Sequence, residues 1–332
     1  MRGRYAAILR YGPPNKRWIS RIESDDFVHW SPKVTVLPRS LIDEPLETEL
    51  YQMVPMQYEG VYFGLISTYN GGTMEKIPKG QEWKDRVNVQ LAYSRNGVTW
   101  HRVGADGIAP HVRRHHREPE NKNFWKHWRD IARKMTFIPC GRGGKDWDWG
   151  QIYPCYPPQV VGNEIRIYYM ARAERHYARH HNAIGPNSIG LATLRLDGFM
   201  SLEAAKAGTI TTRKFVFIGD TLEMIADTAG ESIRVEALDA KGDVIQRFSK
   251  KDCTPITTDR VRHILRWKGK SNCRLLQVRS TSLRFHVNKA KLYFFTPRIR
   301  HKHYVRSYDC KASMAIGASV QTNRLRAKME LK

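Results

Sequence analysis

Short runs of hydrophobic residues separated by polar turns dominate this chain of 332 residues. Two of them, VYFGLIST at 61–68 and IRIYYMAR at 165–172, follow Gly or Asn residues, which tolerate the positive φ of a hairpin turn. The runs ELYQMVPM at 49–56 and QLAYSRNG at 90–97 lie on either side of the first. This pattern predicts meanders of short antiparallel strands.

The meanders repeat along the sequence. ELYQMVPM at 49–56 returns as DWGQIYPC at 148–155, and both have a carboxylate three residues before a Gln. A partial copy comes first, because SDDFVHW at 24–30 shares its Ser-x-Asp/Asn-x-Val-x-Trp pattern with SRNGVTW at 94–100. Four-stranded meanders repeated radially are the blades of a β-propeller. We therefore expect a partial propeller of about three blades in residues 1–199. Three blades cannot close a propeller, so either the sequence is truncated at its N-terminus or the propeller closes by association with another chain; we expect truncation.

The pattern changes after about residue 199. Hydrophobic residues alternate with polar ones at Ile233, Val235 and Ala237, and again within 283–287, with a further run at 291–295. Alternation of this kind is typical of antiparallel sheets with one buried face, and it predicts a β-sandwich in residues 200–296. The expected fold class is all-β: a partial (truncated) β-propeller followed by an antiparallel β-sandwich.

Two basic segments depart from the strand pattern. Residues 111–135 form an insertion between two blades, with hydrophobic residues at steps of four, three and four: Phe124, Trp128, Ile131 and Met135. This spacing predicts a short amphipathic helix that docks on the propeller. Residues 297–332 show no persistent period, and we expect a basic, disordered tail.

The net charge of +24, from 56 Lys and Arg against 32 Asp and Glu, suits a polyanionic partner. An acidic polysaccharide fits this charge better than a nucleic acid, because no nucleic-acid-binding motif is present and the charge concentrates in the insertion and tail. No hydrophobic run is long enough to span a bilayer, and the N-terminus lacks a signal-peptide pattern. The localisation and oligomeric state stay open.

We expect no metal and no cofactor. The five cysteines are scattered, form no CxxC pair, and are typical of buried small residues. Adjacent His residues at 115–116 and 180–181 are poor metal ligands, because neighbours on a strand point to opposite faces. No nucleophile elbow, P-loop or dinucleotide fingerprint occurs in the chain.

The repeated motifs, together with SIGLATLRLDGFMSL at 188–202 and DCTPITTDRVRHILRWKG at 252–269, carry a resemblance. The chain resembles the five-bladed propeller glycoside hydrolases of the clan that includes invertases and arabinanases. It is most similar to uncharacterised bacterial family thirty-two-like glycosyl hydrolases with a C-terminal β-sandwich. This implies a glycoside hydrolase-like protein that acts on or binds a carbohydrate. The signatures of true invertases are absent, and the alternative is a non-catalytic propeller that binds a glycan or another polyanion, or an inactive fragment of a glycosidase.

Ligands of propellers bind where the inner strands begin around the central channel. Glu49 and Asp148 open two such strands and are the candidate catalytic residues, because glycoside hydrolysis needs two carboxyl groups. Alternatively, both carboxylates cap strand ends or pair with arginines. Nearby aromatic rings and side-chain amides are the candidate substrate-binding residues: Tyr51, Gln52, Trp147, Trp149, Gln151, Tyr153 and His176. Packing between blades explains the aromatic rings equally well.

Overall fold

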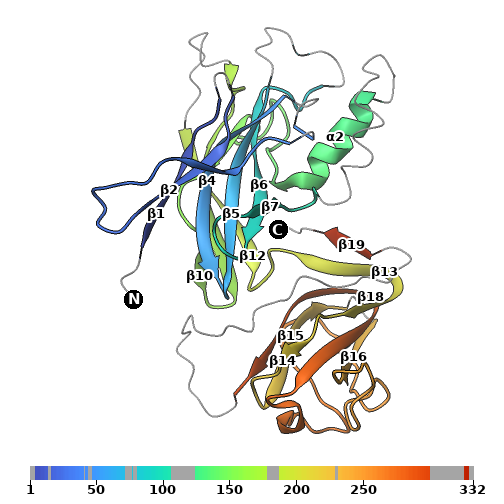
Figure 1. The fold of residues 1–332 in the computed structure, drawn as a ribbon. Coiled ribbons are helices and arrows are strands. Elements are labelled where there is room, and N and C mark those ends of the chain that lie inside the picture. Colours follow the sequence, from blue (N-terminus) through green and yellow to red (C-terminus); the bar gives the residue numbers. More distant parts are fainter. Residues whose placement is uncertain are drawn as a thin grey trace. The chain divides into compact units, whose positions relative to one another are not determined.

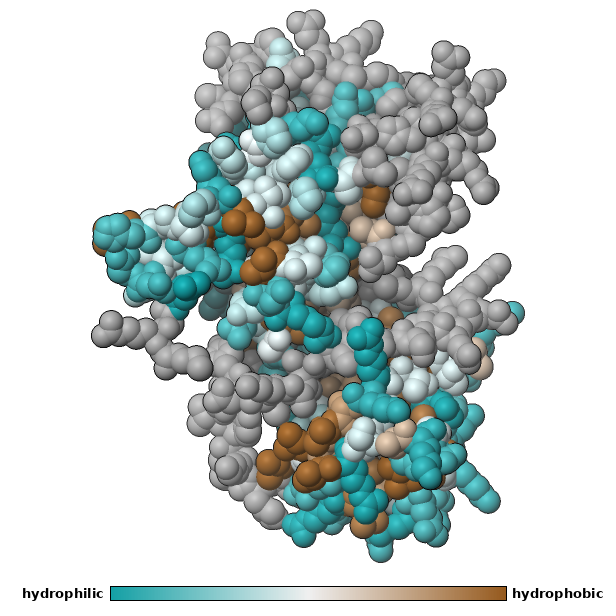
Figure 2. Space-filling model, in the orientation of Figure 1, coloured by the Kyte–Doolittle hydropathy of each residue, from teal (hydrophilic) through white to brown (hydrophobic). Residues whose placement is uncertain are grey.

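The computed structural model describes residues 4–13, 16–40, 42–43, 47–71, 77, 81–105, 124–177, 187–228, 231–299 and 325–328. Strands dominate these residues, and the expected all-β class is confirmed (Figure 1). The chain divides into two compact units, the first formed mainly by residues 1–159 and 166–193, the second by 160–165 and 194–330. Figure 2 shows mostly hydrophilic side chains on the visible face of each unit, with hydrophobic ones gathered in small areas.

Two sheets form the partial propeller of the first unit. A three-stranded antiparallel sheet contains β1 (Tyr5–Arg10), β2 (Ile19–Ser24) and β3 (Val34–Leu37) in that order. A nine-stranded sheet follows with the order β10-β11-β9-β6-β5-β4, with β7 and β8 beside β6 and β12 beside β11. Its strands are β4 (Thr48–Tyr58), β5 (Val61–Asn70), β6 (Arg86–Ser94), β7 (Trp100–Arg102), β8 (Thr136–Ile138), β9 (Gln151–Pro154), β10 (Gln159–Val161), β11 (Glu164–Arg172) and β12 (Asn187–Arg195).

The nine-stranded sheet contains two of the expected meanders. Antiparallel pairing joins β4 to β5, β5 to β6 and β6 to β7, as in one blade. The next meander pairs β9 with β11 and β11 with β12. Between β6 and β9, a single parallel bridge from Val87 to Gln151 joins the two meanders. The sheet therefore consists of two blades joined at one bridge.

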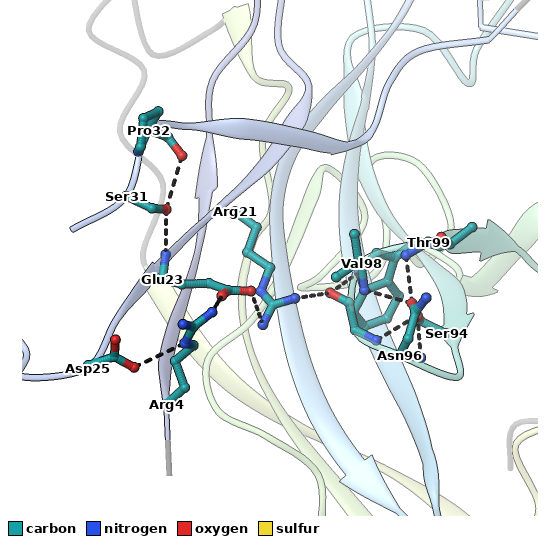
Figure 3. A network of polar contacts seen from close by, with 12 residues as sticks. Arg4, Arg21, Glu23, Asp25, Ser31, Pro32, Ser94, Asn96, Val98 and Thr99 are labelled. Atoms are coloured by element: carbon teal, nitrogen blue, oxygen red, sulfur yellow. Dashed lines mark hydrogen bonds and ion pairs between the residues drawn. The ribbon is translucent and has the colours of Figure 1, made fainter. Parts of the chain in front are cut away.

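The repeated turns at 24–30 and 94–100 have the same hydrogen bonds. The Ser24 hydroxyl accepts from the backbone N–H of Asp26 and Phe27, and one Asp26 oxygen accepts from the next two N–H groups. Ser94 and Asn96 make the equivalent four bonds (Figure 3). Positive φ follows in both turns, at Phe27 and at Gly97. The sequence repeat is thus a repeat of backbone geometry.

Arg21 links β2, the strand before the first turn, to the second turn. Its Nη1 donates to the Gly97 carbonyl at 3.3 Å, and its Nη2 lies 2.8 Å from Glu23, which also pairs with Arg4 (Figure 3). Hydrophobic side chains of both sheets pack together next to this contact. They include Ile19, Val36 and Leu37 from the first sheet and Leu50, Ile66, Ala92 and Trp100 from the second.

The predicted helix is present as α2 (Phe124–Met135). Trp128 is fully buried, and Ile131, Ala132 and Met135 are also buried. They pack with Ile42, Trp83 and Ala105 of the same unit. Strand β8 begins directly after the helix and pairs with β6.

None of the helices in the described part of the chain is long and apolar enough to cross a membrane. The remainder of the insertion, 111–123, lies outside the described residues.

The second unit is the sandwich, built around one long strand. β18 (Ser280–Arg298) pairs with β13 (Ser201–Thr211), β14 (Phe215–Val216), β15 (Thr221–Asp227) and β16 (Ser232–Leu238). β17 (Arg260–Ile264) pairs with β15, a short 3₁₀ helix spans Arg274–Leu276, and β19 (Leu325–Lys328) pairs with β13. The runs 283–287 and 291–295, expected as two strands, form parts of one strand. Within β18, Lys289 has a positive φ and accommodates the irregularity between them.

The predicted alternation describes the core of this unit. Ile233, Val235 and Ala237 are fully buried, as are Leu283 and Phe285 on the paired strand. Part of the tail at 297–332 belongs to strands β18 and β19. Residues 300–324 lie outside the described residues.

Candidate functional site at the starts of the inner strands

The starts of β4 and β9 lie at the same end of the sheet. β4 is antiparallel to β5, β5 is antiparallel to β6, and β6 is parallel to β9, so β4, β6 and β9 run in one direction. β4 and β9 also touch directly, because Gln52 Nε2 donates to the Pro154 carbonyl at 3.1 Å. Glu49, at the start of β4, and Asp148, three residues before β9, are therefore found at the same end of two strands that run in one direction and are separated in the sheet by β5 and β6.

The Glu49 carboxylate is engaged on both oxygens. Oε2 accepts the backbone N–H of Arg17 at 2.6 Å, and Oε1 lies 3.1 Å from Arg39 Nη1. Only 12% of its side chain is exposed. Arg17 follows the β1–β2 turn, so Glu49 ties the start of β4 to the preceding sheet. Of the alternatives left open by the sequence, this geometry agrees with pairing to arginines.

Tyr51 lies in a compact group of rings. Its ring centroid is 5.3 Å from Tyr69 and 5.2 Å from His176, which are themselves 4.6 Å apart. The guanidinium groups of Arg10 and Arg17 lie over Tyr51 at 5.5 and 5.0 Å. Burial raises the pKa of the Tyr51 hydroxyl. Because Tyr51 is only 8% exposed, its ring mainly packs the strand starts together.

Asp85 is a central acidic residue that the sequence reasoning did not select. It is 1% exposed, has a φ of 58°, and accepts the Tyr69 hydroxyl at 3.0 Å and the Tyr177 N–H at 3.1 Å. Burial, followed by the charge of Asp85, raises the pKa of Tyr69. The sequence contains a signal for this residue: Asp85 directly precedes the strand-forming run RVNVQLAY, just as Glu49 precedes LYQMVPM and Asp148 precedes WGQIYPC.

The two candidate glutamines hold backbone segments together. Gln151, 3% exposed, donates from Nε2 to the carbonyls of Glu174 and Arg175 at 3.3 and 3.4 Å. Its Oε1 accepts the Tyr153 hydroxyl at 3.0 Å. Together with the bond from Gln52 to β9, these contacts satisfy the buried amides within the protein.

Trp147 and Asp148 share one supporting residue, Tyr169 of β11. The indole of Trp147 stacks on the Tyr169 ring at 5.9 Å and 10°, and the Tyr169 hydroxyl donates to Asp148 Oδ2 at 3.1 Å. Burial and the neighbouring Asp148 raise the pKa of Tyr169 to about 12. A Cβ at Gly190 would collide with both rings. Trp147 is still 45% exposed, so an aromatic surface remains open beside a carboxylate.

Trp149 lies beside two arginines. Arg86, the first residue of β6, and Arg175, which follows β11, have their guanidinium carbons 5.2 and 5.6 Å from its ring. Gly150 is needed next to it, because a Cβ there would collide with the Glu174 backbone.

The Cys140 thiol donates to the Val87 carbonyl at 3.1 Å, and burial raises its pKa to about 12. Cys140 is therefore a neutral thiol at physiological pH.

The cysteines do not all follow the sequence expectation of burial. Cys253 and Cys273 are buried, Cys140 is intermediate, and Cys155 is exposed. Cys155 directly follows β9. Cys310 and the paired His residues lie outside the described residues. Within the described ranges, no group of three or more His, Cys, Asp or Glu residues could hold a metal ion.

No family model and no curated protein sequence matches this chain. Similar solved structures include a β-1,2-mannobiose phosphorylase from Listeria innocua, 11% identical with a TM-score of 0.33, over 58% of this chain and 38% of that one. A family 43 arabinoxylan arabinofuranohydrolase from Bacillus subtilis is 8% identical with a TM-score of 0.27, over 84% and 59% of the two chains. A family 32 β-fructofuranosidase from Bombyx mori is 9% identical with a TM-score of 0.23, over 89% and 76%. The chain spans about two fifths of the length of the β-1,2-mannobiose phosphorylase.

Proposed function

We propose that this protein acts on or binds a carbohydrate at the starts of the inner strands, with Trp147 as the surface on which a sugar ring stacks. The main support is the exposed indole of Trp147, which stacks on Tyr169 beside the Asp148 carboxylate. Aromatic side chains provide a large, rigid contact area, and a few well-placed polar groups then orient a small ligand. Asp148, directly next in the chain, supplies one such group.

We expect the Trp147→Ala variant to bind an oligosaccharide ligand about tenfold more weakly, since aromatic anchors contribute much of the affinity at such sites. Calorimetric titration with a panel of oligosaccharides measures this effect. Phe27→Ala is the matched control, because it removes another exposed aromatic ring, 64% exposed, from the same unit. Equal affinities of the two variants and the wild type would assign the sugar contact to other residues.

A second candidate function is glycoside hydrolysis with Glu49 and Asp148 as the two carboxyl groups. Their position at the same end of two strands that run in one direction favours it. The reaction requires a separation of about 5–10 Å, the shorter for retention and the longer for inversion. The Arg17 and Arg39 contacts hold both oxygens of the Glu49 carboxylate in place.

If the protein is a hydrolase, Glu49→Gln and Asp148→Asn should each lower turnover of an aryl glycoside by about 10²–10⁴-fold, since each removes an acid, base or nucleophile. Release of the aryl group, with unchanged circular dichroism, is the measurement. Asp25→Asn, at an 80% exposed carboxylate, is the control. Full activity of both amide variants would make the pair structural. Binding without turnover in the wild type would leave the glycan-binding alternative.

A further inference from the structure

We propose that Arg86 and Arg175, both held against Trp149, bind an oxyanion carried by the sugar, either a carboxylate or a sulfate. The inference rests on the proposed carbohydrate function and specifies its ligand as acidic. The guanidinium carbons of both arginines lie within 5.6 Å of the centroid of the Trp149 ring. Guanidinium groups pair with carboxylate and sulfate oxygens through two parallel N–H bonds.

These two arginines differ from three other arginines of the unit whose side chains are largely buried. Arg39 pairs with Glu49, Arg102 with Asp43 and Arg172 with Glu174. Within the described residues, by contrast, Arg86 forms no ion pair, and its Nε is buried without a hydrogen-bond partner. Arg175 donates only to the backbone carbonyls of Glu82 and Lys84. Each of the two guanidinium groups thus lacks a paired carboxylate in the described part of the chain.

Their electrostatic surroundings favour an added anion. Burial lowers the pKa of both Arg86 and Arg175, and the charge of Arg86 lowers the pKa of Arg175 further. The nearby acidic groups are Glu82, which is exposed, and Asp85, whose oxygens accept bonds from Tyr69 and Tyr177. A bound oxyanion would reduce the repulsion between the arginines and replace the water that burial has removed from them.

The location connects this site to the sugar surface. Trp149 is two residues after Trp147, and the Asp148 between them is held by Tyr169. A ligand with neutral and acidic sugar units could therefore contact the open indole and the arginines together. A sugar without an anionic group would gain nothing from Arg86 and Arg175, so the pair would select for acidic sugars.

The test is calorimetric titration of the full chain with four probes: trigalacturonate, uncharged galactotriose, a sulfated disaccharide and sodium sulfate. We expect an acidic sugar to bind at least about tenfold more tightly than galactotriose, with an affinity that falls as salt is added. Arg86→Gln and Arg175→Gln should each weaken acidic-sugar binding by about tenfold and leave galactotriose binding unchanged. The carboxylate and sulfate probes decide which oxyanion is preferred.

Two controls keep the result interpretable. Arg279→Gln removes the same charge from an exposed position and should bind like the wild type. Arg86→Lys and Arg175→Lys keep the charge but lose the planar fork, so they should retain more affinity for acidic sugars than the Gln variants. They also test the site if a Gln variant folds poorly.

Equal binding of acidic and neutral sugars by the wild type and the Gln variants would overturn the anion site and leave the carbohydrate function standing. Binding of sodium sulfate as tightly as of any sugar would overturn the claim that the anion belongs to a carbohydrate. The absence of binding by all four probes would count against both the anion site and the proposed function.

Discussion

The Trp128→Ala variant should lose about 3–5 kcal/mol of unfolding free energy, the cost of truncating a fully buried large aromatic residue. Trp128 of α2 is 0% exposed and packs with Ile42, Trp83 and Ala105, which come from distant parts of the first unit. Truncation would leave a cavity between the helix and the loop segments that contain Ile42, Trp83 and Ala105, because the rest of the unit holds these segments in place. Denaturant unfolding followed by circular dichroism measures the change.

Lys126→Ala is the matched control for this variant. Lys126 lies on the same helix and is exposed, so its truncation should change stability by no more than about 0.5 kcal/mol. A loss below about 1 kcal/mol for Trp128→Ala would show that the helix contributes little to the fold of the unit.

The Asp43→Ala variant should also lose about 3–5 kcal/mol, because it leaves a buried guanidinium without its counterion. Arg102 and Asp43 have side chains 5% and 1% exposed, and Arg102 Nη1 lies 2.7 and 2.6 Å from the two Asp43 oxygens. Arg102 also donates to Gln90 Oε1 at 3.0 and 2.6 Å, and Asp43 accepts from Ser40. The pair thus joins the 40–43 turn to β6 and β7.

The exposed pair of Arg4 and Asp25 gives the comparison for Asp43. Its side chains are 61% and 80% exposed, so Asp25→Ala should cost at most about 1 kcal/mol. Both variants can be measured by the same unfolding experiment. Similar losses for Asp43→Ala and Asp25→Ala would mean that water reaches Arg102 and replaces the lost carboxylate.

The sequence alone determined the features that depend on near neighbours along the chain. Alternation at Ile233 and Val235 determined which face of β16 is buried, because side chains of a strand point alternately to opposite faces. The repeated turns were readable, because Ser and Asp or Asn side chains bond to backbone groups two and three residues on. The all-β class follows from such local signals.

Only the tertiary structure decided which side chains meet at the strand starts. Asp85 reaches Tyr177, and Arg86 and Arg175 reach Trp149, through pairings between segments far apart in the sequence. No local pattern encodes these contacts, since they depend on which strands pair and in which register. The contacts of Glu49 were also decided at this level, because Arg17 and Arg39 approach it only when the first two sheets pack together.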